Sequence, residues 1–349
     1  MVSAPTSLLN FLAAAATLSV LACSACDEGA SKALASKDAG RDAVSDAPVP
    51  LDATLDVGSF ADFDCVHAPV VQRCSEGWCE IPAGCFVYGS PEDEWGRGLR
   101  DEERVRVTLT HPFRLQQHEH TQAEWTAAGY SNPSGLMANG TGDCLGPNCP
   151  VGNVTWFEVA AYANALSAKA GLESCYQLSG CTGELGKGTT CESVSGTVAS
   201  IYECKGYRLP TDAEWEYAVR AGTLTTFYSG PITVYERSSC APDPNLEAIA
   251  WYCYNAGPRT HPVGQKQANA WGLYDMSGNA YEWVNDGAIY SSPTSPISDP
   301  GGSIVHAIAG AVRGGSFNGW STLLRSATKR EVTRAQRGPS LGFRLARTM

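Results

Sequence analysis

Hydrophobic and polar residues follow two distinct patterns along the chain, and each pattern predicts a different element. Residues 105–110 (VRVTLT) alternate apolar and polar side chains, which predicts a strand with one buried face. Three segments instead place a Thr three residues before a Glu, at Thr121–Glu124, Thr155–Glu158 and Thr211–Glu214. In this arrangement the hydroxyl and the carboxylate can satisfy the first free amides of a helix. We therefore expect helices to begin at these three points.

Glycines mark where two of these helices are expected to end. Gly171 follows the strongly helical segment that starts at Trp156, and Gly222 follows the segment that starts at Asp212. Gly, Pro, Asn and Ser fill much of the remaining chain and predict turns and loops. A few helices, short strands and much irregular loop indicate an α+β domain, not the regular alternation of a parallel α/β sheet.

The chain before this domain divides into two segments. Residues 8–23 form an apolar stretch of signal-peptide type that ends in VLAC. This ending is similar to a bacterial lipoprotein signal with Cys23 as the lipidated residue, and an ordinary secretory signal is the alternative. Residues 24–62 are rich in Ala, Asp, Ser and Pro, which predicts a flexible tether. We therefore predict a signal peptide over residues 1–23, a tether over 24–62 and one folded domain over 63–349.

The cysteines also have the pattern of an exported protein. Of the 14 cysteines, Cys23 and Cys26 lie in the leader region and the other 12 lie beyond residue 60. Among these 12 cysteines no spacing is CxxC or that of a zinc finger, and an even number in an exported domain predicts up to six disulfides. We expect the pairs Cys144–Cys149 and Cys240–Cys253, and leave the others open. The expected location is the periplasm or the cell surface, with a lipid anchor in the membrane, or the medium if the protein is secreted.

Composition narrows the class of partner. The chain has 349 residues, of which 43% are hydrophobic and 17% charged, enough apolar content for a substantial core. The formal net charge is −11, and the sequence contains no basic run of the kind that neutralises phosphates. We therefore expect no nucleic-acid partner.

Six motifs occur in order along the domain. They are CEIPAGCFVYGSPEDEWGRGLRDEERVRVTL (79–109), CPVGNVTWFEVAAYANALS (149–167), GYRLPTDAEWEYAVRAGT (206–223), NAWGLYDMSGNAYEWVND (269–286), VRGGSFNGW (312–320) and LGFRLAR (341–347). Together they resemble the formylglycine-generating enzyme, or sulfatase-modifying factor, family. The resemblance implies that family's fold, an elaborated form of the C-type-lectin-like fold that is low in regular secondary structure. This expectation agrees with the α+β, disulfide-rich chain inferred from the residues.

The resemblance also implies a structural calcium ion in the segment DMSGNAYEW. Asp275 and Glu282 would contribute side-chain oxygens, and Gly278 and Ala280 would contribute backbone carbonyls. Ca²⁺ accepts several oxygen ligands at flexible geometry, which suits this set. The alternative is a turn with Asn279 in the left-handed conformation and no ion.

The resemblance does not extend to the residues that carry the family's copper chemistry. The resembled enzymes bind copper through two cysteines and convert a substrate cysteine into an aldehyde. The first cysteine would fall at Gly319 and the second at about Leu324, and no cysteine occurs after Cys253. Because a Cu(I) site needs soft thiolate ligands, we do not expect copper as a cofactor.

What remains of this segment is a candidate ligand loop. Ser316, Asn318, Trp320 and Arg325 would line a cleft where the oxidase holds its peptide, since polar groups beside aromatic rings suit ligand binding. In the alternative interpretation, Phe317 and Trp320 belong to the core, and Arg325 and Arg344 neutralise buried acids.

Two further clusters are weaker candidates for chemistry. The spacing of Glu214 and Glu216 puts them on different helix faces, so we do not expect a paired-carboxylate site there. His118, Glu119 and His120 could hold a metal ion in principle, but the sequence shows no third ligand for the two histidines.

The predicted function follows from these observations. We expect an exported, membrane-tethered, sulfatase-modifying-factor-like pseudoenzyme without copper-dependent formylglycine-generating activity. It would act as a binding or scaffold module for a peptide, a glycan or another protein. The alternative is an oxidoreductase of the formylglycine-generating class that oxidises protein cysteine through a substitute site, so whether the protein is an enzyme stays open at this point.

Overall fold

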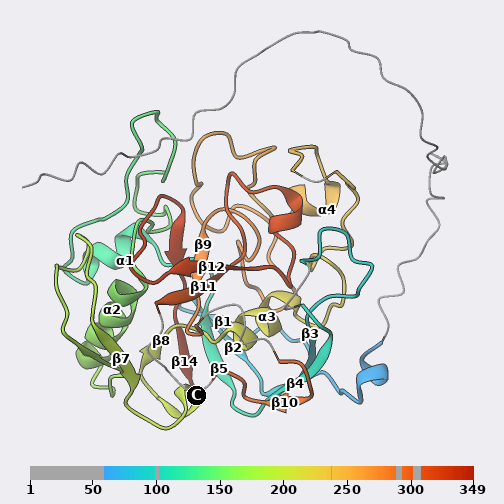
Figure 1. The fold of residues 1–349 in the computed structure, drawn as a ribbon, viewed down its shortest axis with the longest axis horizontal. Helices are drawn as coiled ribbons and strands as arrows, with labels where there is room; N and C mark the ends of the chain where they lie inside the picture. Colours follow the sequence, from blue (N-terminus) through green and yellow to red (C-terminus); the bar gives the residue numbers. More distant parts are fainter. Residues whose placement is uncertain (1–58, 99–101, 237, 288–292, 302–307) are drawn as a thin grey trace, which may run out of the picture. The chain divides into compact units, whose positions relative to one another are not determined.

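The computed structural model describes residues 59–98, 102–236, 238–287, 293–301 and 308–349 (Figure 1). The predicted signal peptide, Cys23 and the tether up to residue 58 lie outside the described residues. The final residues assigned to the tether are described, and Phe60–Phe63 forms the short 3-10 helix η1. Within the described ranges, no helix has the length and apolar character needed to cross a bilayer.

The described residues contain many short strands and few helices, as the sequence predicts. The helices are α1 (Gln122–Ala127), α2 (Trp156–Lys169), α3 (Asp212–Arg220) and α4 (Pro244–Glu247), with the 3-10 helices η2 (Ile201–Glu203) and η4 (Ser321–Leu323). The strands are β1 (Cys74–Ser75), β2 (Trp78–Ile81), β3 (Gly84–Tyr88), β4 (Val105–Leu109), β5 (Phe113–Gln116), β6 (Tyr176–Ser179), β7 (Ser193–Gly196), β8 (Tyr207–Arg208), β9 (Tyr281–Trp283), β10 (Ile297–Ser298), β11 (Ala309–Arg313), β12 (Lys329–Thr333), β13 (Leu341–Phe343) and β14 (Ala346–Thr348).

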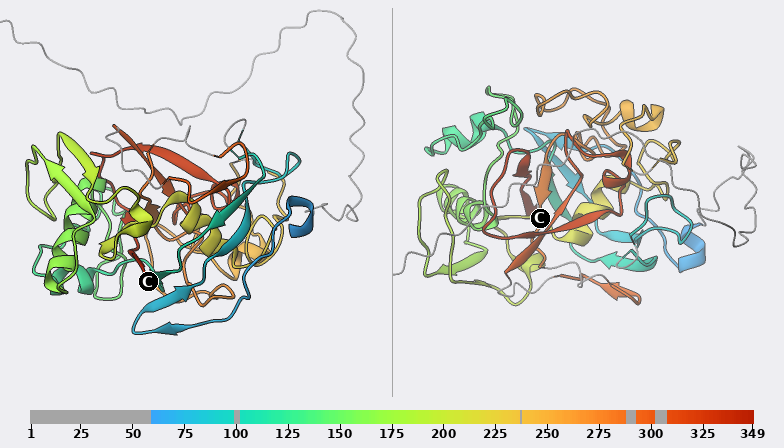
Figure 2. Two further views of the ribbon diagram at one scale, coloured as in Figure 1. Left: turned by 90° about the horizontal axis from the view of Figure 1, so that it is seen from below. Right: turned by 45° about the horizontal axis from the view of Figure 1, so that its top comes forward.

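The strands form four small sheets that mix distant parts of the chain. Their orders are β1-β2-β5-β14-β8, β10-β4-β3, β12-β11-β9-β13 and β6-β7. Most neighbours are antiparallel, whereas β10–β4 and β13–β9 are parallel. The C-terminal strands, coloured red, lie between the green helix α2 on one side and β3 and β4 on the other (Figures 1 and 2).

The five-stranded sheet has one buried face and one face turned toward α1 and α2. Cys79, Leu115 and Ala346 point into the core and are fully buried. The alternate residues Trp78 and Tyr207 are only partly buried. Because side chains alternate between the two faces of a strand, the register Trp78↔Gln116 and Glu80↔Arg114 places these four residues on the outer face.

All three predicted helix starts are confirmed. Thr121, Thr155 and Thr211 each accept a hydrogen bond from the backbone N–H of the Glu three residues later, and each Glu carboxylate reaches back to the N–H of its Thr. Helix α2 ends at Lys169, shortly before Gly171 (φ 67°). Helix α3 ends at Arg220, likewise two residues before its glycine, Gly222, and the intervening Ala221 adopts the left-handed conformation (φ 43°).

Two hydrophobic clusters support the fold. The larger one collects the buried tryptophans Trp125, Trp156, Trp215, Trp271 and Trp283 with the inner faces of the sheets. The smaller one contains Phe227, Ile232, Leu246, Ile249, Ala250, Tyr252 and Leu324. The second cluster lies under the loops that carry the candidate ligand site, so its packing positions that site.

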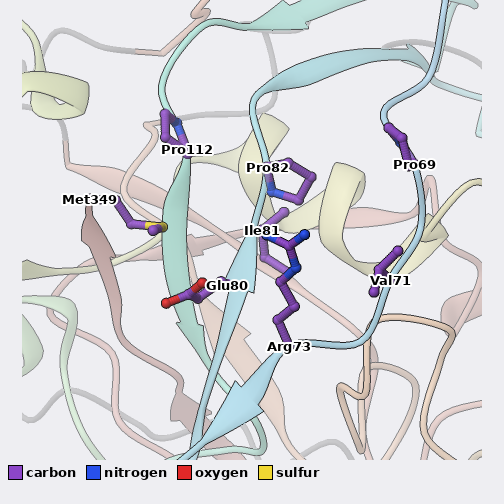
Figure 3. A pocket seen from close by; sticks show the side chains of 8 residues that line it. All are labelled: Pro69, Val71, Arg73, Glu80, Ile81, Pro82, Pro112 and Met349. Atoms are coloured by element: carbon purple, nitrogen blue, oxygen red, sulfur yellow. The ribbon is translucent and has the colours of Figure 1, made fainter.

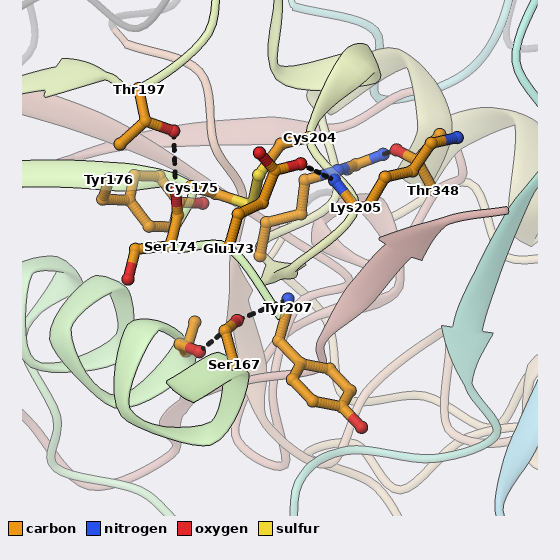
Figure 4. The surroundings of a disulfide bond; sticks show 12 residues. Ser167, Glu173, Ser174, Cys175, Tyr176, Thr197, Cys204, Lys205, Tyr207 and Thr348 are labelled. Atoms are coloured by element: carbon orange, nitrogen blue, oxygen red, sulfur yellow. Dashed lines mark hydrogen bonds between the residues drawn. A yellow bond between two sulfur atoms is a disulfide. The ribbon is translucent and has the colours of Figure 1, made fainter. Parts of the chain in front are cut away.

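Six disulfides pair all 12 cysteines of the domain. Cys144–Cys149 and Cys240–Cys253 are confirmed, and the pairs that the sequence left open are Cys65–Cys85, Cys74–Cys79, Cys175–Cys204 and Cys181–Cys191. Around Cys175–Cys204, the hydroxyl of Ser167 accepts from the N–H of Tyr207 at 2.8 Å, and Thr197 donates to the carbonyl of Ser174 at 2.6 Å (Figure 4). The disulfide therefore joins the start of β6 to the end of η2, and the Ser167–Tyr207 hydrogen bond joins the end of α2 to the start of β8.

Candidate functional site

The ligand loop begins where β11 ends and is held by backbone hydrogen bonds to two other segments. Gly314 and Gly315 have φ values of 86° and 75°, which residues other than glycine rarely adopt. The N–H of Phe317 donates to the carbonyl of Asn279 at 2.8 Å. The N–H of Cys253 donates to the carbonyl of Gly319 at 3.2 Å. The loop therefore lies against both the DMSGNAYEW segment and the Cys240–Cys253 disulfide.

Gly319 and Leu324, the two positions at which the resemblance places copper-binding cysteines, face each other. A Cβ atom added to Gly319 would lie 2.9 Å from Cδ1 of Leu324. Leu324 is fully buried in the second hydrophobic cluster. An apolar side chain thus fills the space between the two positions, where thiolates would have to meet the ion.

No thiol within the described residues is available as a replacement. All 12 domain cysteines form disulfides. A disulfide sulfur carries no thiolate charge, and Cu(I) sites in proteins depend on that charge and its softness. The described residues of the domain therefore do not fit a Cu(I) ion.

Three of the four predicted ligand-loop residues are grouped at one end of the loop. Asn318 is exposed and Trp320 is 39% exposed, so both present side chains to solvent. Ser316 is buried, and its hydroxyl donates to Oδ1 of Asn318 at 2.8 Å. The alternative that assigns Trp320 to the core is wrong, whereas Phe317 is buried as that alternative expects.

Arg325 does not line a cleft, and this part of the prediction is wrong. Its guanidinium is 1% exposed and forms ion pairs with Glu94 and Glu102, each at 2.7 Å. Its Nε donates to the carbonyl of Thr322 at 3.1 Å. A buried guanidinium requires such partners, because the cost of removing a charge from water is large. Arg325 therefore neutralises buried acids, as the alternative interpretation proposes.

Additional exposed aromatic residues, which the sequence analysis missed, surround the ligand loop. Tyr235 is 58% exposed and its ring lies 5.9 Å from that of Trp95. Gly96, the residue after Trp95, lies so close to the ligand loop that a Cβ atom added to it would come within 2.5 Å of the Thr322 side chain. The Trp95–Tyr235 pair therefore adjoins the loop. Tyr254, 47% exposed, follows Cys253 next to Gly319. No periodic pattern identifies these rings, because each comes from a different irregular segment.

The predicted calcium segment contains one buried carboxylate oxygen without a partner. Oδ2 of Asp275 accepts from the N–H of Gly264 at 2.6 Å, while Oδ1 has no hydrogen-bond partner among the described residues. Burial raises the pKa of Asp275 to about 6. An unsatisfied buried oxygen of this kind fits a cation ligand.

Glu282 fits a calcium ion less well than Asp275. Arg344 donates to both of its carboxylate oxygens at 2.7 Å, and the indole N–H of Trp215 donates to Oε2 at 2.7 Å. The same contacts confirm that Arg344 neutralises a buried acid. Any metal ion would have to share Glu282 with Arg344.

A third carboxylate, Glu119, which the sequence analysis assigned only to the His118–His120 segment, adds to the negative charge of this region. Glu119 is fully buried and accepts from Asn279 Nδ2 and from the N–H of Ala280, each at 3.0 Å. Burial, followed by repulsion from Asp275 and Glu282, raises the pKa of Glu119 well above its usual value. The carboxyl groups of Glu119, Asp275 and Glu282 thus lie near the single guanidinium of Arg344. A bound cation would offset the excess of negative charge.

The backbone of this segment has the turn geometry of the alternative without an ion. Asn279 has a φ of 56° and is left-handed, as that alternative expects. Within the described residues, no group of three or more His, Cys, Asp or Glu side chains is arranged to hold a metal ion. Gly278 and Ala280 have no side-chain oxygen, so they could bind a cation only through their backbone carbonyls.

The His118–His120 segment does not form a metal site. His120 is buried against Tyr162, 2.7 Å from its hydroxyl, and burial lowers the pKa of His120 to about 4. His118 instead contacts the carbonyl of Glu119 through Nδ1. The predicted separation of Glu214 and Glu216 is also observed, since Glu214 pairs with Arg208 and Glu216 pairs with Arg220 and Arg313.

A compact cavity of about 250 Å³ lies near the start of the domain, away from these segments in the sequence. It is lined by Pro69, Val71, Arg73, Glu80, Ile81, Pro82, Pro112 and Met349 (Figure 3). Glu80 is already paired with Arg114 at 2.7 Å. The remaining lining is mostly apolar, so the cavity shows no set of polar groups that would orient a ligand.

Comparison with known proteins places this geometry in a family. Residues 68–349 match the Sulfatase-modifying factor enzyme 1-like domain. The chain is 34% identical over 207 residues to the chaperone protein LppX of Paenibacillus barcinonensis. The aligned region covers 54% of this chain and 66% of LppX. The chain is also 27% identical over 300 residues to the formylglycine-generating enzyme of Streptomyces coelicolor, which covers 78% of this chain and 90% of that enzyme.

Solved structures agree with the sequence relatives. Treponema denticola variable protein 1 superposes with a TM-score of 0.61 at 26% identity, covering 81% of this chain and 100% of its own. PvdO from Pseudomonas aeruginosa superposes with a TM-score of 0.58 at 26% identity, covering 81% of this chain and 99% of its own. The predicted fold is therefore confirmed, and the chain belongs to the sulfatase-modifying factor, or formylglycine-generating enzyme, domain family.

Proposed function

We propose that this protein is an exported binding module of the family that has no copper-dependent formylglycine-generating activity. One observation carries the proposal: the resemblance places the two copper cysteines at Gly319 and at about Leu324, which is buried and so close that a Cβ on Gly319 would lie 2.9 Å from its Cδ1. All 12 domain cysteines are committed to disulfides, which leaves no thiolate in the described domain to replace them.

The binding surface in this proposal is the end of the ligand loop with its neighbouring aromatic rings. Two loops meet at this surface, joined by the hydrogen bond between Cys253 and Gly319. One loop exposes the amide of Asn318 and the indole of Trp320, and the other exposes the phenol of Tyr254. Exposed aromatic rings of this kind are enriched where proteins contact partners. The similarity to a protein named a chaperone supports another protein or peptide as the ligand, and a glycan remains the second option.

The proposal also includes export and a membrane tether. A signal peptide over residues 1–23, with Cys23 lipidated, would leave residues 24–62 as the tether of the domain. The six disulfides support an oxidising compartment. Globomycin-type inhibition of lipoprotein processing, and a Cys23→Ser variant, should both release the protein from the membrane fraction or block its maturation.

A paired copper experiment tests the loss of activity. The purified protein is incubated with Cu(I), analysed for bound metal, and assayed for oxygen consumption with a cysteine-containing sulfatase peptide. We expect no stoichiometric copper and no peptide oxidation. The matched variant Gly319→Cys/Leu324→Cys should gain copper, because the two positions adjoin and replacing Leu324 by a shorter side chain relieves the contact that a side chain at Gly319 would make. Copper binding with peptide oxidation by the unaltered protein would overturn the proposal in favour of the oxidoreductase alternative.

A crosslinking experiment tests the binding surface. A photoreactive amino acid is introduced at the exposed position Asn318 and, as a matched control, at the exposed Asn139 on another loop. We expect a discrete crosslinked product in cells from position 318 that position 139 does not give and that Trp320→Ala diminishes. Identical products from both positions would count against a specific ligand loop.

A further inference from the structure

A second cavity lies between the outer face of the five-stranded sheet and the helices α1 and α2. Its volume is about 450 Å³, within the range of about 300–1,000 Å³ that is usual for small-molecule sites. The sheet contributes Trp78 and Tyr207, and the helices contribute Glu124, Tyr162 and Lys169. It shares no lining residue with the ligand loop, so this inference does not depend on the proposed function.

The floor of the cavity is a closed hydrogen-bond network that fixes its shape. Nε2 of Gln116 lies 3.0 Å from Nδ1 of His120, and Nε2 of His120 lies 2.7 Å from the hydroxyl of Tyr162. That hydroxyl donates to the carbonyl of Glu124 at 3.2 Å. Oε1 of Gln116 accepts from the N–H of Leu345 at 2.8 Å. Because the Tyr162 hydroxyl gives its own proton to Glu124, it accepts from Nε2–H of His120, and Nδ1 of the neutral imidazole then accepts from Gln116.

The wall of the cavity presents aromatic rings. The ring centroids of Trp78 and Tyr207 are 5.6 Å apart with an interplanar angle of 38°. Both residues lie on the outer face of the sheet and are partly exposed, in contrast to the buried Cys79 and Arg208 beside them. Such rings offer an apolar face to a ligand while the surrounding groups remain polar.

Two charged groups of opposite sign retain hydrogen-bonding capacity in the lining. The Glu124 side chain is 41% exposed, and its Oε1 receives only the 3.2 Å contact from Gln116. Lys169 is exposed at the end of α2 and donates one hydrogen bond, to the carbonyl of Ala128, which leaves two N–H groups. The pair carries no net charge, so the cavity favours neither an anion nor a cation.

We propose that this cavity binds a neutral saccharide, with one sugar ring against Trp78 and Tyr207 and its hydroxyls bonded to Glu124 and Lys169. A hydroxyl both donates and accepts, so one ligand class satisfies a carboxylate and an ammonium group together. The C–H face of a pyranose ring is apolar and matches an aromatic wall. An exclusively apolar ligand would remove water from both charged groups and offer no partner to their remaining donors and acceptors.

Ligand-observed NMR on the purified full chain tests the proposal. The probes are the methyl glycosides of glucose, mannose, galactose and N-acetylglucosamine, with glycine and phenylalanine as zwitterionic comparisons. We expect saturation transfer to at least one glycoside and to neither amino acid. Binding should weaken about tenfold in Lys169→Ala, which removes a charged hydrogen bond at an exposed helix end without touching the core.

Matched variants locate the site. Trp78→Ala should abolish the signal and Trp78→Phe should retain part of it, while Lys205→Ala and Trp320→Ala should bind as the unaltered protein does. No transfer to any glycoside, or transfer to an amino acid instead, would overturn the proposal. Loss of glycoside binding in Trp320→Ala but not in Lys169→Ala would also overturn it, and would assign the sugar to the ligand loop of the proposed function.

Discussion

At the residue scale, Leu324 anchors the proposed ligand loop in the interior of the domain. Its side chain packs into the second hydrophobic cluster and meets the position where a side chain at Gly319 would be. Burying a leucine there stabilises the loop by roughly 1.5–3 kcal/mol relative to leaving it exposed. This packing helps to hold the loop in position, and no thiolate of the described domain is free beside it to supply a soft ligand.

Asp286 should make stability depend on pH. Burial, followed by repulsion from Asp212, raises its pKa from 3.8 to about 7. A raised carboxyl pKa contributes stability that is present below pH 3.8 and is lost as the pH rises through about 7. Asp286→Asn keeps an acceptor for the N–H of Asp212 and removes this loss.

The expected result is a pH-dependent gain of Asp286→Asn over the unaltered protein. The difference in the free energy of unfolding should grow by roughly 4 kcal/mol from pH 4 to pH 7 and then level off. Urea unfolding at a series of pH values measures it, with the exposed Asp93→Asn variant as the matched control. A constant difference across that window would show that Asp286 is ionised throughout.

Asp275 is the residue on which the proposed calcium ion depends. Its buried Oδ1 lacks a partner, and two further carboxylates lie near the single Arg344. Calcium at a hundred times its dissociation constant would stabilise the fold by about 2.7 kcal/mol, so we expect Tm to rise by several degrees over a sample in EGTA. Scanning calorimetry measures this rise, which Mg²⁺ should not reproduce and Asp275→Ala should eliminate. Equal Tm values in calcium and EGTA would favour the turn without an ion.

At the scale of elements, α3 combines a local start signal with partners supplied by the fold. Its residues are buried along its entire length. Asp212 and Glu216 pair with Arg313 from β11, and Glu214 pairs with Arg208 from β8. A helix this rich in charge can lie in the core only because each carboxylate has a guanidinium partner.

Removing the cap of α3 should cost more than removing the cap of α1. Thr211 caps α3 while also bonding to the hydroxyl of Tyr202 at 2.8 Å, and it is fully buried. Thr211→Ala should lower the free energy of unfolding by about 2 kcal/mol, and Thr121→Ala by about 1 kcal/mol. Urea unfolding compares them, with Thr211→Ser as the variant that keeps the hydroxyl. Equal costs would mean that burial adds nothing to the cap.

At the scale of the whole molecule, disulfides and buried ion pairs compensate for little regular structure. Six disulfides cross-link the domain, and one of them, Cys74–Cys79, joins the paired strands β1 and β2. Arg325 links η4 to the loop after β3 through Glu94 and Glu102. These cross-links hold irregular loops in one arrangement, which a loop-borne binding surface requires.

The cost of losing a disulfide should follow the length of the loop it closes. Cys175–Cys204 closes a separation of 29 residues and Cys144–Cys149 one of five. Chain entropy predicts losses of about 3.5 and about 2 kcal/mol for the paired Cys→Ala variants. Chemical denaturation of the two double variants measures the difference. A larger loss from Cys144→Ala/Cys149→Ala would show that native-state contacts, not loop closure, dominate.

Sequence reasoning succeeded where the signal is local. The capping boxes at Thr121, Thr155 and Thr211 depend on atoms within one helical turn, and both short-range disulfides that it named are present. The order of the six motifs was enough to identify the family, because each motif is continuous along the chain.

Tertiary structure decided the roles of residues whose partners are distant in sequence. Arg325 lies 231 and 223 positions from Glu94 and Glu102, so no spacing could have distinguished a buried ion pair from a cleft residue. Glu119 meets Asn279 across 160 positions for the same reason. The sequence by itself determined the fold family and the absence of cysteines after Cys253. Only the folded chain determined that Leu324 is buried beside Gly319 and that Trp78 and Tyr207 share a cavity, because packing and charge neutralisation act between segments that meet only after folding.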